Sequence, residues 1–195
     1  RKMRLKEERE RIYIDGRGRI APSQYDLKMR ISIPDTVVKK AGLSKEIEAK
    51  INAAIKKLDS EYVIYLDSIK GGKLKKNDIF ATGAYLDENG MLRHGLVLNY
   101  KQDYRKVETI MPRWYNDGEM VHIMPFQNCV SEVEYIELNE KIRRQFIAGI
   151  SGYADRSKDG RECLAEAFVR YRNGEWIPDE ARKLIRKYIL HWRRV

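Results

Sequence analysis

The sequence predicts an α+β fold, in which a small, mostly antiparallel sheet with one crossing helix is followed by a helical second half. Two patterns before residue 100 favour strands: runs of alternating or β-branched apolar residues, and an Asn89-Gly90 pair typical of hairpin turns. Beyond residue 130 the apolar residues recur every three or four positions, which is typical of helices. We therefore expect one domain over residues 12–195, strand-rich over 12–100 and helix-rich over 101–195.

Four segments are expected to form strands. Residues 27–33 alternate apolar and polar side chains and end at a proline, as in a half-buried strand. Residues 62–66, Tyr-Val-Ile-Tyr-Leu, are a β-branched and aromatic run typical of a more buried strand. The other two, 79–86 and 91–99, flank the hairpin turn. The Gly- and Lys-rich stretch 70–76 lacks the spacing of a phosphate-binding loop, so we interpret it as a basic loop.

Four helices are expected as well. The first begins after Ser44, a favourable N-cap residue, and its apolar residues from Ile47 to Leu58 fall on one face. The others cover residues 132–148, residues 161–173 with Gly174 as the residue after the C-cap, and the C-terminal stretch that starts near Pro178.

The charge of the chain indicates an anionic partner. Lys and Arg number 39 against 29 Asp and Glu, which gives a net charge of +10 at pH 7. No stretch approaches the roughly 20 apolar residues that span a bilayer, so we expect no membrane partner. The two cysteines, Cys129 and Cys163, form no CxxC pair, and we expect neither a disulfide framework nor a cysteine-based zinc site.

The first eleven residues are almost entirely charged. They read Arg-Lys-Met-Arg-Leu-Lys-Glu-Glu-Arg-Glu-Arg, which is typical of a helical connector or a solvated tail. Because the chain starts with Arg1 rather than Met, we favour a connector over residues 1–11 that leads out of an upstream domain of a longer protein.

The stretch from Tyr153-Ala154 to Glu162-Cys-Leu-Ala-Glu-Ala-Phe-Val-Arg-Tyr171 resembles a known pattern. It is similar to the C-terminal part of zincin-like domains, which include relatives of the anthrax lethal factor catalytic domain and domains in minor head proteins of tailed phages, of the phage Mu F type. In that family a strand, matched here by Leu96-Val-Leu-Asn99, precedes a helix with an HExxH motif. A later helix supplies a Glu as third zinc ligand, and the resemblance assigns this position to Glu166.

The chain departs from the family at the expected zinc site, because no HExxH motif occurs in it. His122 matches the first ligand, but Ile123 then stands where the family has its general base, and Phe126 where it has the second ligand. Pro125 would also disrupt the interior of a ligand-bearing helix. Catalytic zinc takes three protein ligands and a water, so His122 and Glu166 are only remnants of a metal site. We expect no cofactor and no catalytic residue.

The resemblance then implies a structural role. We expect a non-enzymatic minor head protein of a tailed bacteriophage, located in the virion and, during assembly, in the host cytoplasm, with portal or capsid proteins as partners. One alternative is an active zinc metallopeptidase or a toxin-like effector domain. The Glu-x-Glu of Ser131-Glu-Val-Glu134 occurs in ADP-ribosyltransferases, but the chain lacks their Ser-Thr-Ser strand.

A further alternative is a basic DNA-binding protein, with packaged DNA as a partner of the virion component. Cations and aromatic residues are interleaved in the C-terminal helix, where the cations would neutralise phosphates. The candidate nucleic-acid-binding residues are Lys183, Arg186, Lys187, Arg193 and Arg194.

Overall fold

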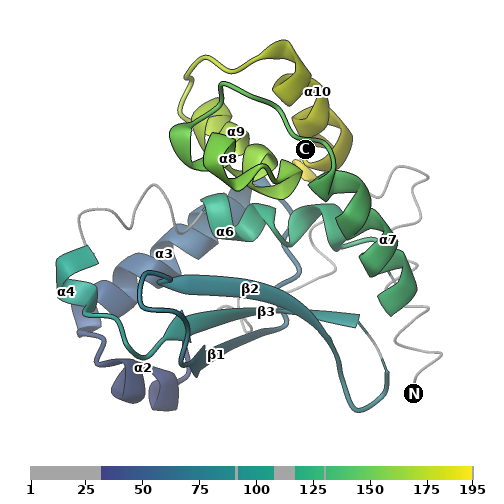
Figure 1. Cartoon of the computed structure of the whole chain (residues 1–195). Coiled ribbons are helices and arrows are strands. Elements are labelled where there is room, and N and C mark those ends of the chain that lie inside the picture. Colours follow the sequence, from purple (N-terminus) through teal and green to yellow (C-terminus); the bar gives the residue numbers. More distant parts are fainter. Residues whose placement is uncertain (1–31, 91, 108–116, 130, 195) are drawn as a thin grey trace.

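The structure is a computed structural model that describes residues 32–90, 92–107, 117–129 and 131–194 (Figure 1). These residues form an α+β fold with a three-stranded sheet and, in the described part of the chain, eight α-helices and two short 3₁₀ helices. In chain order the elements are α2 (Asp35–Ala41), α3 (Lys45–Glu61), β1 (Ser68–Gly72), β2 (Phe80–Leu86), β3 (Leu92–Asn99), α4 (Tyr104–Val107), α6 (Asp117–Val121), η3 (Met124–Phe126), α7 (Glu132–Arg143), α8 (Gly152–Ser157), α9 (Gly160–Arg172), α10 (Asp179–Tyr188) and η4 (Leu190–Trp192).

The sheet has the order β1-β3-β2 and is mixed rather than mostly antiparallel. Strands β2 and β3 form the expected hairpin, in which Gly83 is paired with Gly95. Strand β1 instead runs parallel to β3, with Lys70 paired to Val97. The prediction of a basic loop over residues 70–76 is therefore wrong for residues 70–72, which belong to β1. A Cβ at Gly71 would lie 2.0 Å from the ring of Tyr100, so this glycine allows β1 to approach the end of β3.

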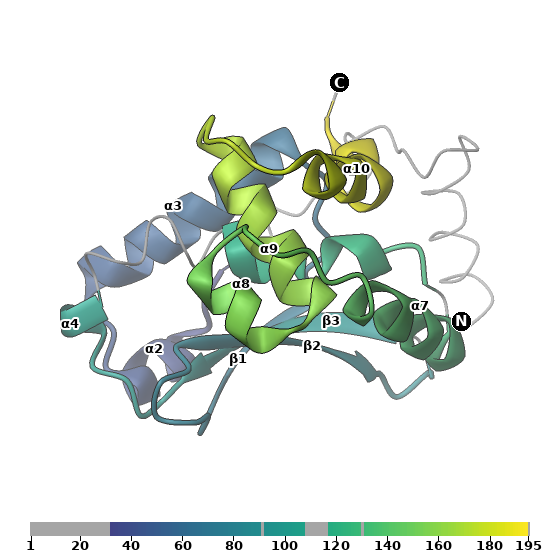
Figure 2. The same ribbon diagram turned by 45° about the horizontal axis from the view of Figure 1, so that its top comes forward.

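The helices are arranged around this sheet. Helix α6 contacts β2, and α2 contacts β1 and β3. Figures 1 and 2 show α6, α8 and α9 together on one side of the sheet, while α2 lies on the other side in the view of Figure 1. Helix α9 contacts α6, α7, α8 and α10, so it is the centre of the helical layer.

The expected helices are confirmed with changes at their ends. Ser44 caps α3 by accepting a hydrogen bond from the Ile47 N–H at 3.2 Å. Helix α7 ends at Arg143 and not at 148, and α10 ends at Tyr188. Gly174 follows the C-cap of α9 with φ +69°. Helix α2 was not predicted. Residues 1–11 and most of the predicted strand 27–33 lie outside the described residues.

The run 62–66 is buried as expected, but it is not a strand of the sheet. Its backbone partners come from elsewhere. The Val63 N–H donates to the Trp192 carbonyl at 2.8 Å, and Tyr62 forms an isolated bridge with Arg193. The side chain of Gln127 accepts from the Tyr65 N–H and donates to the Val63 carbonyl. The C-terminal turn and the side-chain amide of Gln127 thus make the backbone hydrogen bonds that a neighbouring strand would otherwise make.

Replacing Gln127 by Leu is expected to destabilise the fold strongly. The change leaves a buried N–H and a buried carbonyl without this partner, at a cost of about 1–3 kcal/mol each. Urea denaturation measures the loss. The matched control is Gln145→Leu, whose amide bonds at the surface to Lys141 and to the partly buried Tyr188 hydroxyl. Equal losses in the two variants would contradict the structural role of Gln127.

Candidate functional site

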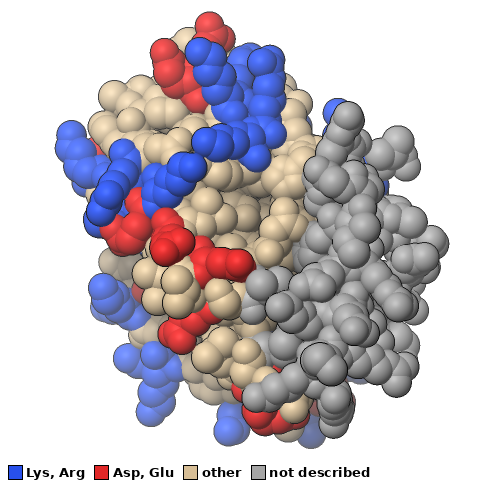
Figure 3. All heavy atoms as spheres, turned by 90° about the vertical axis from the view of Figure 1, so that its right-hand side faces the viewer, with Lys and Arg blue, Asp and Glu red and all other residues tan. Residues whose placement is uncertain are grey.

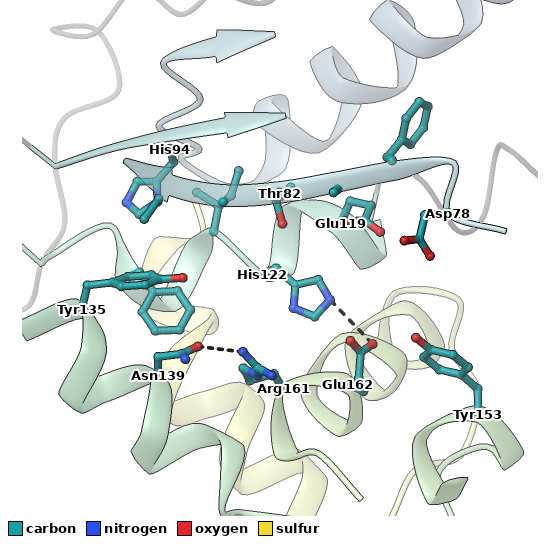
Figure 4. A pocket seen from close by; sticks show the side chains of 16 residues that line it. Asp78, Thr82, His94, Glu119, His122, Tyr135, Asn139, Tyr153, Arg161 and Glu162 are labelled. Atoms are coloured by element: carbon teal, nitrogen blue, oxygen red, sulfur yellow. Dashed lines mark hydrogen bonds and ion pairs between the residues drawn. The ribbon is translucent and has the colours of Figure 1, made fainter. Parts of the chain in front are cut away.

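A pocket lies between strand β2 and helices α6, α8 and α9 (Figure 4). It consists of two adjoining hollows, of about 290 Å³ and about 420 Å³, which share six lining residues. The shared residues are Asp78, Phe80, Glu119, His122, Tyr153 and Glu162. We call the cavity defined by these residues the α6–α9 pocket.

Helix α6 and the turn after it supply two of these side chains. Glu119 lies within α6, and His122 follows the last residue of the helix, with its N–H donating to the Glu119 carbonyl at 3.1 Å. The Nε2 atom of His122 lies 3.7 Å from a carboxylate oxygen of Glu162 (Figure 4). Burial lowers the pKa of His122, and the neighbouring Glu162 opposes this shift.

Glu119 has a strongly perturbed pKa. Burial raises the pKa of its carboxyl group to about 8, and the charges of Glu162 and Asp78 act in the same direction. At neutral pH the group is therefore mostly protonated and able to donate a hydrogen bond. The pocket combines an uncharged carboxyl group with an imidazole whose protonation is disfavoured by burial.

Helix α9 lines the pocket with Glu162 and Glu166, which lie one helical turn apart. Glu166 is buried, with 5% of its surface exposed. Arg161 is held by Asp159, the N-cap of α9, and by the Asn139 side chain of α7 at 3.2 Å. These contacts fix the rotation of α9 and with it the direction of its two carboxyl groups.

The loop that carries Asp78 is tied to the end of β3 by Asn99. This side chain is fully buried. Its Nδ2 donates to the carbonyls of Lys75 and Asp78 at 2.9 and 2.6 Å, and its Oδ1 accepts from the N–H groups of Leu74 and Lys101 at 3.1 and 3.0 Å. The amide is thus saturated, and it holds the loop at one edge of the pocket.

The structure brings His122 and Glu166, the two candidate metal-site remnants, to the same cavity. It does not supply a zinc site around them. Within the described residues, no group of three His, Cys, Asp or Glu side chains is arranged to hold a metal ion. Ile123 and Phe126 are apolar and buried, and Pro125 lies in the short helix η3. The residues present therefore do not fit a catalytic zinc, which requires three protein ligands.

Sequence reasoning missed Glu119 and Glu162, although their spacing carries a signal. Glu119 and His122 are three residues apart, and Glu162 and Glu166 are four apart, so each pair lies on one side of its segment. The window Gly118-Glu-Met-Val-His122 also has the spacing of HExxH, with glycine in place of the first histidine. In this window both Glu119 and His122 line the pocket.

The candidate nucleic-acid-binding residues lie outside this pocket. Lys183, Arg186 and Lys187 are exposed on α10, and Arg193 is exposed after η4. Arg194 has a different environment, because its guanidinium donates to the Asp59 carboxylate at 2.8 Å. This intramolecular ion pair ties the C-terminus to the end of α3.

The Glu-x-Glu of residues 132–134 also has a structural explanation. Ser131 is the N-cap of α7 and accepts a hydrogen bond from the Glu134 N–H at 3.2 Å. Glu132 and Glu134 lie in the first turn, where acidic residues stabilise a helix.

Comparisons with known proteins add no relationship: no protein-family model, no curated protein and no solved structure matches the chain. In the part of the chain that the structure describes, no helix is both long and apolar enough to cross a bilayer.

Replacing Glu119 by Gln tests the burial of its carboxyl group. A carboxyl group with a folded pKa of about 8 and an ordinary value of 4.5 binds more protons in the folded state, so stability falls as pH rises between these values. Each pH unit costs at most about 1.4 kcal/mol. Thermal unfolding at pH 5 and pH 8.5 should show that Glu119→Gln raises Tm relative to wild type at the higher pH only. An equal Tm difference at both pH values would contradict the raised pKa.

Proposed function

We propose that the chain is a non-enzymatic structural component of a tailed-phage head, a minor head protein whose zincin-like domain has lost its metal site. The observation that carries the proposal is that Glu119, His122, Glu162 and Glu166 line the α6–α9 pocket, where His122 lies 3.7 Å from Glu162. The resemblance assigns His122 and Glu166 to ligand positions of a zincin, and in the register Gly118–His122 Glu119 takes the place of the general base.

The glycine at position 118 accounts for the loss of the metal site. In the register Gly118–His122 the general base and the second histidine remain, but the first histidine is absent. A Cβ at Gly118 would lie 3.8 Å from the Cγ2 atom of Val169 on α9, which is an ordinary contact. The position thus has room for a side chain that faces α9, and the chain does not supply a ligand there.

The proposed partners are portal or capsid proteins, which the chain would contact in the virion and, during assembly, in the host cytoplasm. Large apolar side chains at the surface support a protein partner. Trp176 is 73% exposed, and Val133 and Ile136 lie one turn apart on α7 at 63% and 52% exposure. Exposed tryptophan is enriched among the residues that anchor protein interfaces.

Restoring the missing histidine tests this proposal. Wild-type protein should contain no stoichiometric zinc, whereas Gly118→His should bind close to one zinc ion per chain, because the new imidazole joins His122 and an α9 carboxylate. Elemental analysis after dialysis against zinc measures the content, and circular dichroism checks the fold. The matched control is the double variant Gly118→His/His122→Ala, which should lose the gained zinc.

Zinc bound by the wild-type protein would instead support the alternative of an active enzyme. If wild-type protein carries one zinc ion per chain and Glu166→Gln releases it, the domain is a zinc metallopeptidase or a toxin-like effector, and the structural proposal is wrong. A gain of zinc that persists in the double variant would show that the ion binds elsewhere, and would overturn the proposed register.

A further inference from the structure

Helix α10 has one buried side and one strongly basic side. Its apolar residues Ala181, Leu184, Ile185 and Tyr188 are buried, which attaches the helix firmly to the rest of the fold. Lys183, Arg186 and Lys187 are exposed, and their spacing of three and four residues places them on one face. Figure 3 shows Lys and Arg side chains gathered over the upper part of this face of the molecule, where α10 lies.

The cations of this face are not neutralised by the protein. Among the described residues, no carboxylate forms an ion pair with Lys183, Arg186 or Lys187. Two arginines elsewhere do form ion pairs: Arg143 pairs with Glu140 at 2.8 Å, and Arg172 pairs with Glu61 at 2.7 Å. Helix α10 thus carries three exposed cations on one face without an ion pair to a described residue.

The segment that follows α7 meets α10 at Tyr188. The Nε2 atom of Gln145 donates to the Tyr188 hydroxyl at 3.0 Å, which brings the C-terminal end of α7 against the end of α10. Arg144, the residue before Gln145, has a side chain that is 77% exposed, and its guanidinium lies 3.9 Å from the carboxylate of Glu140. Arg144 is therefore an exposed cation close to the C-terminal end of α10.

A phosphate backbone fits this surface better than a membrane does. Amphipathic helices bind membranes by inserting their apolar side, and that side of α10 is occupied by the protein core. What remains available is a row of exposed cations on a helix that its buried side holds in place, which suits the phosphates of duplex DNA. Contacts to phosphates carry no sequence information, so we expect binding that is independent of sequence.

We propose that Lys183, Arg186 and Lys187, extended by Arg144, form a sequence-independent binding surface for the phosphate backbone of duplex DNA. The inference deepens the function proposed above, on which it rests for the source of the DNA in the phage head. Its test is independent of zinc, so failure of one proposal is distinguishable from failure of the other.

The test is the salt dependence of DNA binding by the whole chain. Fluorescence anisotropy with a labelled duplex of arbitrary sequence gives the affinity at a series of KCl concentrations. The triple variant Lys183→Gln/Arg186→Gln/Lys187→Gln should reduce the slope of log affinity against log salt by about 3, or about 0.9 for each lost phosphate contact. Arg144→Gln should reduce it by about 1.

The matched control removes the same charge from another helix. Lys45, Lys56 and Lys57 are exposed on α3, and their triple change to Gln should leave the slope within about one unit of wild type. Lys183→Arg/Lys187→Arg should bind like wild type. Because the α10 cations lie near the negative end of a helix dipole, Tm is compared to confirm that each variant is folded.

Three results would overturn the inference. An equal reduction of the salt slope in the α10 and α3 variants would show that net charge alone attracts DNA. An unchanged salt slope in both variants would show that α10 does not contact the DNA. Binding of vesicles rich in phosphatidylserine with no binding of duplex DNA would identify a membrane surface as the partner.

Discussion

The position of helix α9 is the constraint on which the rest of the structure depends. It contacts α6, α7, α8 and α10, and all of its residues from Cys163 to Val169 are buried. A helix packed on several sides cannot rotate without breaking its contacts, so the carboxyl groups of Glu162 and Glu166 are held toward the pocket. At its start, Gly160 permits the close approach to α7, since a Cβ there would lie 2.0 Å from the Ile142 carbonyl oxygen.

The two charged regions of the molecule follow from burial. In the pocket, carboxyl groups lie close to one another and partly out of water, so the proton that Glu119 keeps relieves their repulsion. On α10 the cations remain in water, where mutual repulsion is weak and screened by salt. The same helical layer thus carries partly buried carboxyl groups in the pocket and exposed cations on α10.

Much of the fold was accessible from local patterns, and the failures have a common cause. The cap at Ser44, the hairpin at Asn89-Gly90 and the end of α9 at Gly174 depend on neighbours in the sequence, and these predictions are confirmed. The run 62–66 has strand-like composition, but its hydrogen bonds go to Gln127 and to the C-terminal turn. Such partners, more than sixty residues away, leave no trace in the local pattern.

The sequence by itself determined the α+β class and the basic charge, since periodicity, capping residues and composition do not depend on distant contacts. It also showed that Glu166 and His122 have side chains of the kind that bind a metal ion. Only the tertiary structure decided that β1 runs parallel to β3, that Glu119 and Glu162 meet His122 in one cavity, and that Asp59 engages Arg194 while the α10 cations stay unpaired. The physical reason is that burial and charge pairing depend on which distant segments approach one another. The packing of distant segments decides which of them meet, and local backbone preference does not.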